Sequence, residues 1–474
     1  MESFFVDNKK YCYIIISLIE GEVMKHSMDM TTGNLFTKIL FYSLPIMATS
    51  FLQLFYNTCD VIVVGQFAGS DALAAVGANT ALINLIVTFF LGLSVGASVV
   101  YARAIGAKDY AKANRTTHTA VVISLVSGVL LTIIGLIGAK QFLTWMSCPE
   151  EVLDLATLYL RIYAAGFIFN VYYYYTSAVV RAHGDTKRPL LILAAAGILN
   201  ICLNLLFVIV FKMSVAGVAL ATIISQATSS IIITIIMVKE KSSLHLSIKD
   251  LKVDRDILKD IIKIGIPSGL QGSLFSISNV IIQSSINGFG TVTMAGNTSA
   301  QNIEAFVWVA MNSFTQAALN FSGQNHGAKN MKNIYKVMFY SVFYAVMAGL
   351  VLGLTAYLLG GYLLQLYSTD SAVITVGLKR MSYVCATYAL CGFMDALAGS
   401  LRGIGHSFTP MVVTVLGICV YRVVWIYTIF VENHTLDMLY ITYPISWILT
   451  GVVLVVCAFI AYPRLSKVLK VTNS

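Results

Sequence analysis

Three polar side chains that could bind a cation lie inside one long apolar segment of this sequence. Gln53, Tyr56 and Asp60 are three and four residues apart, so a helix places them on one face. A carboxylate at membrane depth costs about 2.5–3.5 kcal/mol on insertion scales unless it is paired, hydrated or protonated. The segment therefore predicts a cation or proton site at Asp60 that faces a cavity. The alternative is a structural carboxylate that is hydrogen-bonded inside a helix bundle.

The composition places these side chains in a membrane protein. Of the 474 residues, 58% are hydrophobic and only 11% are charged, whereas a soluble chain carries about 25% charged residues. The sequence contains no GxxxxGK[ST] motif and no HExxH motif, which disfavours an ATP-driven pump and a hydrolytic enzyme. Its eight cysteines form no CxxC pair, so we expect neither a disulfide framework nor a structural metal site.

Twelve apolar segments follow one another from Gly33 onward, each long enough to cross a bilayer. Alternate breaks between them hold most of the Lys and Arg, and the break at 239–263 is the richest. By the positive-inside rule both termini are cytoplasmic. Residues 1–30 are interpreted as a cytoplasmic extension or a mis-assigned start. The predicted helices lie near 34–66, 71–103, 113–140, 150–181, 186–211, 214–238, 256–287, 293–323, 331–362, 371–402, 407–431 and 437–463.

An internal repeat divides these helices into two halves of six. The motif GAK occurs at 106–108 and again at 327–329, and the pattern R-x-x-G-x4-P at 181–189 recurs with the same offset at 402–410. Six helices per half give both halves the same orientation in the membrane. The sequence thus predicts an all-α polytopic membrane protein of two pseudo-symmetric six-helix bundles around a central cleft. The predicted divisions are an extension at 1–30, a first lobe at 31–238, a linker at 239–255, a second lobe at 256–466 and a tail at 467–474.

Several stretches resemble the multidrug and toxic compound extrusion (MATE) family. They are SLPIMATSFLQLFYNTCDVIVVGQFAGSDALAAVGA, GAKD, RAHGDTKRP and LNICLN, and the resemblance covers residues 33 to about 465. It implies a secondary antiporter of the plasma membrane that expels organic, mainly cationic compounds against a Na+ or H+ gradient. We expect no cofactor besides that coupling ion, no nucleic-acid partner and a monomer.

The resemblance also implies a cation site in the first lobe. In that family a carboxylate of the first helix and polar residues of the fifth helix form the site, and the sixth helix gives a weaker match. The matching residues here are Asp60, Tyr56, Gln53, Asn200, Asn204 and Thr222. On physical grounds, one carboxylate with amide and hydroxyl oxygens suits Na+ held by Asp60, Asn200 and Asn204, or a proton on Asp60. Hydrogen bonding between helices is the alternative role for the two asparagines.

The second half lacks these polar residues and carries other charges inside its helices. Glu304, Asp395 and Arg422 are the candidates there for binding substrate or a proton. The alternative for Glu304 is a charge-neutralising contact with Arg422, which would lower the cost of burying both. Asp395 could face the cleft or the interior of the lobe.

A flippase for a lipid-linked saccharide is the alternative function that we weigh. Such a protein would be expected to need a basic cleft for a pyrophosphate group. The candidate residues Asp60, Glu304 and Asp395 outnumber Arg422, which favours a cationic guest.

Overall fold

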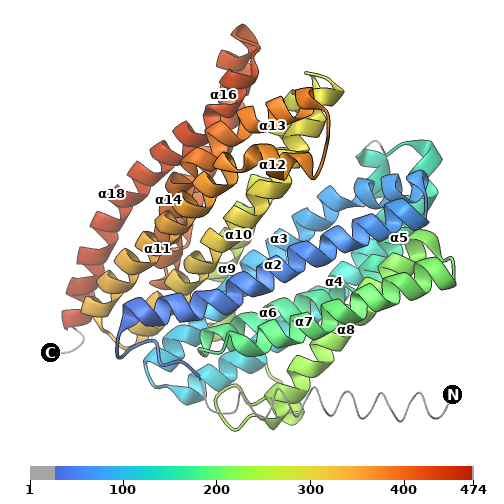
Figure 1. Ribbon diagram of the computed structural model, residues 1–474. Coiled ribbons are helices and arrows are strands. Elements are labelled where there is room, and N and C mark those ends of the chain that lie inside the picture. Colours follow the sequence, from blue (N-terminus) through green and yellow to red (C-terminus); the bar gives the residue numbers. More distant parts are fainter. Residues whose placement is uncertain (1–26, 147, 472–474) are drawn as a thin grey trace, which may run out of the picture. The chain divides into compact units, whose positions relative to one another are not determined.

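The computed structural model describes residues 27–146 and 148–471, which form helices joined by short turns (Figure 1). No β-strand occurs in these ranges. A helical chain suits a bilayer, because a helix pairs its own backbone groups without water. In chain order the elements are α2 (Leu35–Phe67), α3 (Ser70–Gly106), α4 (Tyr110–Trp145), α5 (Glu150–Ala165), α6 (Phe167–Ala182), α7 (Lys187–Asn204), η1 (Leu205–Val210), α8 (Ser214–Lys239), η2 (Ile248–Asp250), α9 (Arg255–Asn287), α10 (Thr291–Gly327), α11 (Met331–Leu358), α12 (Gly360–Gln365), α13 (Ser371–Val384), η3 (Cys385–Thr387), α14 (Tyr388–Gly403), α15 (Phe408–Thr414), η4 (Val415–Val420), α16 (Tyr421–Trp425), η5 (Ile426–Phe430), α17 (Leu436–Tyr440) and α18 (Thr442–Val471).

Most of these helices are long and apolar enough to cross a membrane. Nine candidate spans pass by length and hydropathy, and the bent pair α5 and α6 makes a tenth. The helices α9 and α10 have 33 and 37 residues but are less apolar. They bring the membrane-length helices in the described residues to the predicted twelve, although their membrane insertion stays a prediction.

Packing divides the described residues into two compact units. Unit 1 holds the residues up to Asp29 together with Leu52–Ala81 and Ala111–Asp254. Unit 2 holds Met30–Phe51, Leu82–Tyr110 and the residues from Arg255 onward. Helices α2 and α3 therefore contribute to both units. The lobe boundaries at 31–238 and 256–466 follow the sequence repeat and remain a prediction.

The internal repeat is visible in the backbone. Residues in the left-handed region recur with the offset of the two GAK motifs, and each pair occupies the same place in its half. Two of these positions are lysines, where a positive φ is strained and so needs support from the fold. The pairs are Gly69 and Gly290, Lys108 and Lys329, and Gly184 and Gly405. The repeat predicted from sequence motifs is therefore also a repeat of local conformation.

Interruptions of the helices recur in the same way and correct two predicted helices. The predicted helix 150–181 bends by 47° at Gly166, where a Cβ would stand 2.5 Å from Ile223 Cγ1. The predicted helix 371–402 is interrupted by η3, which ends at Thr387, the position equivalent to Gly166 in the repeat. The π-helices η1 and η5 also begin at equivalent positions of the two halves. Hydropathy reports the length of a membrane segment and cannot report these breaks.

Small residues bring α3 and α9 into close contact within unit 2. A Cβ on Gly92 would stand 2.5 Å from Gly269 Cα, and one on Gly96 would stand 2.2 Å from the Ile261 carbonyl. Gly265 likewise faces the carbonyl of Leu93 at 2.7 Å. Each helix thus contributes a G-x-x-x-G pair, the pattern that lets membrane helices pack backbone to backbone.

Candidate functional site

Asp60 on α2 contacts the end of α7 within unit 1. The Nδ2 group of Asn204 donates to Asp60 Oδ1 and, at 3.2 Å, to Asn200 Oδ1. Asn200 and Asn204 expose only 6% and 1% of their surface. The carboxylate and the amide pair are therefore joined in one hydrogen-bonded cluster, although they lie far apart in the sequence.

Tyr56 ties the same two helices together one turn away. Its hydroxyl donates to the Ala194 carbonyl at 3.2 Å. A Cβ on Gly197 would stand 1.8 Å from Tyr56 Cζ, so the ring occupies the space that any larger residue would fill. The glycine makes room for the tyrosine, and the tyrosine fixes α2 beside α7 at the level of Asp60.

The helix that carries the asparagines changes its winding at Asn204. Helix α7 ends there and continues as the π-helix η1. A π turn inserts a residue and redirects the following side chains, and such turns occur frequently at functional sites. The cluster therefore lies where the regular α geometry of this segment stops.

The remaining predicted residues of the first lobe make their hydrogen bonds elsewhere. The Gln53 side chain hydrogen-bonds the Tyr174 hydroxyl, which Asn170 also contacts. The Thr222 hydroxyl donates to the Val218 carbonyl of its own helix at 3.0 Å. Gln53 thus belongs to a neighbouring polar group, and no hydrogen bond in the described residues joins Thr222 to Asp60.

Two tyrosines that the sequence did not single out lie within electrostatic range of Asp60. Tyr159 and Tyr163 on α5 both interact electrostatically with the Asp60 carboxylate. Their rings stack on each other at 6.0 Å between centroids. The spacing of four was a usable signal, but tyrosines are common in this chain and the approach of α5 to α2 is a matter of packing.

The cluster has the chemistry of a site for a hard monovalent cation or a proton. The Oδ1 atom of Asn204 is buried and lacks a hydrogen-bond partner among the described residues. The Nδ2 atom of the same amide donates to the Asp60 carboxylate, which none of the ion pairs in the described residues joins to a Lys or Arg. Oxygen donors of this kind suit Na+. A proton on Asp60 would neutralise the same carboxylate without a metal ion.

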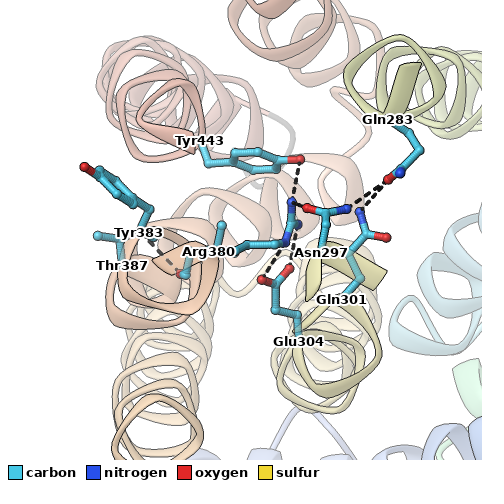
Figure 2. A network of polar contacts seen from close by, with 9 residues as sticks. Gln283, Asn297, Gln301, Glu304, Arg380, Tyr383, Thr387 and Tyr443 are labelled. Atoms are coloured by element: carbon cyan, nitrogen blue, oxygen red, sulfur yellow. Dashed lines mark hydrogen bonds and ion pairs between the residues drawn. The ribbon is translucent and has the colours of Figure 1, made fainter. Parts of the chain in front are cut away.

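The second-lobe candidate Glu304 is paired, and its partner differs from the expected one. Glu304 on α10 receives a two-pronged hydrogen bond from Arg380 on α13, with N–O distances of 2.9 and 2.7 Å (Figure 2). The two side chains expose 5% and 3% of their surface. The alternative that paired Glu304 with Arg422 is therefore wrong: α13 packs against α10 and brings Arg380 to Glu304.

A polar network surrounds this ion pair in unit 2. Figure 2 shows Arg380 between Glu304 and the ring of Tyr443, with its Nη1 donating to Asn297 Oδ1 at 2.9 Å. The Asn297 amide in turn donates to Gln283 Oε1 at 3.0 Å. This satisfaction of the buried charges is what a structural ion pair needs. The network has the character of a stabilising element more than of an open binding site.

Arg422 and Asp395 lie nearby but apart from that pair. Arg422 Nε donates to Ser446 Oγ at 3.1 Å, and its guanidinium lies 4.2 Å from the centroid of Tyr443. Asp395 accepts a weak bond from the Cys391 thiol at 3.8 Å and interacts electrostatically with Arg402. The three second-lobe candidates therefore belong to three different local pairings.

Comparison with known proteins identifies the family of this chain. The family model described as MatE matches residues 45–206 and again residues 267–428, so it matches each half of the repeat once. The probable multidrug resistance protein YpnP of Bacillus subtilis (strain 168) is 26% identical over 396 residues, which cover 83% of this chain and 88% of that protein. The multidrug export protein MepA of Staphylococcus haemolyticus (strain JCSC1435) is 25% identical and covers 80% and 81%.

Solved structures share the whole fold. An outward-facing multidrug resistance MATE family transporter of the MOP superfamily aligns with a TM-score of 0.87 at 26% identity, covering 94% of this chain and 99% of that one. A MOP superfamily transporter from Pyrococcus furiosus aligns with a TM-score of 0.86 at 26% identity, covering 91% of this chain and 97% of that one. With a family model that matches more than half of its residues, this chain belongs to the MatE family, whose members are membrane transporters and not enzymes.

Proposed function

We propose that the chain is a secondary active antiporter that exports organic, mainly cationic drug-like compounds in exchange for Na+ or H+ by alternating access. It would act in the plasma membrane, with both termini cytoplasmic. Support for the cargo comes from relatives named as multidrug resistance and multidrug export proteins. The names of these relatives give no support to the alternative, a flippase for a lipid-linked saccharide.

The observation that carries the proposal is the cluster of Asp60, Asn204 and Asn200. It combines a carboxylate on one helix with a buried amide pair on another, and leaves the Asn204 Oδ1 atom without a partner among the described residues. When bound, Na+ would supply a positive charge that neutralises the carboxylate. A proton on Asp60 would do the same without a ligand shell.

Coupling follows if the occupied and empty clusters favour different shapes of unit 1. An ion shifts a conformational equilibrium only when it binds the two shapes with different affinity. Asp60 and Asn204 lie on different helices, so a change in their contact changes how α2 meets α7. Tyr56 holds the same pair of helices and would transmit that change along α2.

The test uses vesicles that contain the purified full-length chain. Ethidium efflux is measured under an imposed Na+ gradient and, separately, under a proton gradient. Asp60→Asn keeps the size and hydrogen bonding of the side chain but removes its charge and titration. We expect this variant to fold and bind ethidium while gradient-driven efflux is lost. Asp71→Asn, an exposed carboxylate on α3, is the matched control and should transport like the wild type.

A second variant identifies the ion. Asn204→Asp adds a negative charge next to Asp60, so two coupled carboxylates share one site. We expect tighter Na+ binding under sodium coupling, or a shifted pH optimum under proton coupling. Wild-type, ion-dependent efflux by Asp60→Asn would show that the proposed coupling site is wrong.

A further inference from the structure

Unit 2 contains buried nitrogen donors that lack a hydrogen-bond acceptor among the described residues. Arg422 exposes 1% of its surface and Trp447 exposes 3%. Among the described residues, Arg422 Nη1, Arg422 Nη2 and Trp447 Nε1 are buried atoms without a hydrogen-bond partner. Guanidinium and indole nitrogens donate and never accept. These three nitrogens can therefore be satisfied only by an acceptor that the described residues do not bring to them.

Both side chains pack on the ring of Tyr443. The Arg422 guanidinium carbon is 4.2 Å from the ring centroid, and the Trp447 ring is 6.0 Å from it, in an edge arrangement. Ser446 holds Arg422 from the same helix by accepting from Nε. Helix α18 thus holds the guanidinium through the Nε bond to Ser446 and the contact with the Tyr443 ring. The two terminal nitrogens, Nη1 and Nη2, make no hydrogen bond to the described residues.

No carboxylate in the described residues forms an ion pair with Arg422, because the nearby acids interact with other arginines. Glu304 is occupied by the two-pronged bond from Arg380. The Asp395 carboxylate interacts electrostatically with Arg402. The other guanidinium near Arg422 is that of Arg380, which repels it. A buried charge whose donors are unmet is strongly unfavourable, so this arrangement favours an added acceptor of negative charge.

We propose that Arg422 is the centre of an anion site in unit 2 that binds a small monovalent anion. The anion is either a free halide or a carboxylate group carried by the cargo, since both offer the acceptor that the terminal nitrogens of Arg422 need. The site is separate from the Asp60 cluster and does not depend on the coupling ion or on the direction of transport.

The first measurement is thermal unfolding of the purified full-length chain in nanodiscs at constant Na+ and ionic strength. Sodium chloride, sodium bromide and sodium benzoate are each titrated against the sodium salt of the bulky sulfonate MES. A bound anion should raise the midpoint in a saturable way. At ten times its Kd the folded-to-unfolded ratio should rise about elevenfold. Arg422→Gln should abolish this rise, whereas Arg161→Gln, which removes an exposed arginine of α5, should keep it.

The titrations with different anions distinguish the two sources of the anion. A rise with chloride and bromide assigns the site to a free halide, and a rise with benzoate alone assigns it to a cargo carboxylate. Anomalous diffraction from bromide-soaked crystals of the wild type locates the ion beside Arg422 even if Arg422→Gln does not fold. If none of the three anions stabilises the wild type beyond MES, water satisfies these donors and the proposal is overturned. Because no transport is measured, that failure would leave the proposed antiport untouched.

Discussion

Gly197→Ala places one methyl group where the ring of Tyr56 lies against α7. The new Cβ would stand 1.8 Å from Tyr56 Cζ and 1.9 Å from Cε2, so the ring has to move away. Alanine gains about 1 kcal/mol of helix propensity over glycine. Losing the Tyr56 hydrogen bond to Ala194 costs about 1 kcal/mol, and overpacking costs roughly 1–3 kcal/mol more. The variant should therefore be about 1–3 kcal/mol less stable than the wild type.

A double-mutant cycle with Tyr56→Ala isolates this cause. Without the ring, the methyl group of Gly197→Ala enters free space and should stabilise the chain by about 1 kcal/mol. Gly77→Ala on α3 is the matched control, because nothing lies within 4 Å of its Cβ, and it should stabilise in both backgrounds. The assay is the free energy of unfolding in detergent micelles. An effect of Gly197→Ala with the same sign in both backgrounds would refute the proposed contact of α2 with α7.

Three further predictions concern other parts of the chain. Glu304→Gln should cost about 3–5 kcal/mol of unfolding free energy because Arg380 is left buried and unpaired, and adding Arg380→Gln should restore part of it in the same assay. Burial lowers the pKa of His183 to about 4, whereas unfolded histidine titrates near 6.5. The stabilising contribution of neutral His183 should therefore be complete above pH 6.5, and the free energy of unfolding should fall by up to about 3 kcal/mol as the pH drops to 4. In His183→Gln the free energy of unfolding should depend less on pH across that range. A chain that starts at Met28 should insert and transport normally, as judged by its yield in membranes and by vesicle efflux. It keeps every described helix, and its terminal amino group can donate to the Gly184 carbonyl in place of the Met28 amide. Failure to insert would contradict this.

The first-lobe cluster was accessible from the sequence for a specific reason. Asp60 and Tyr56 share a helical face, and so do Asn200 and Asn204, so periodicity groups each set. The family resemblance then joins the two sets. The part that sequence could not supply is the fit between helices. The Tyr56 ring fits against α7 only because Gly197 has no side chain, and the pattern of polar residues does not predict this contact.

The second-lobe ion pair shows why pairing between helices is harder to predict. Glu304 and Arg380 lie on helices that are far apart in the sequence, and nothing in the sequence separates Arg380 from Arg422 as the partner. The choice depends on which turn of which helix packs against α10. Residues 1–26 lie outside the described residues, so the interpretation of the N-terminal extension stays a prediction.

Equivalent positions in the two halves carry different polar groups, and this difference argues for where a cation binds. When the two GAK motifs are aligned, Tyr159 corresponds to Arg380 and Thr222 corresponds to Tyr443. Tyr159 interacts electrostatically with the carboxylate of Asp60, whereas Arg380 donates two hydrogen bonds to the carboxylate of Glu304. In the second half, Arg380 thus neutralises the charge of Glu304 within the protein. The first half has a neutral phenol at the same position, which supports the proposal that Asp60 binds a cation or proton from solution.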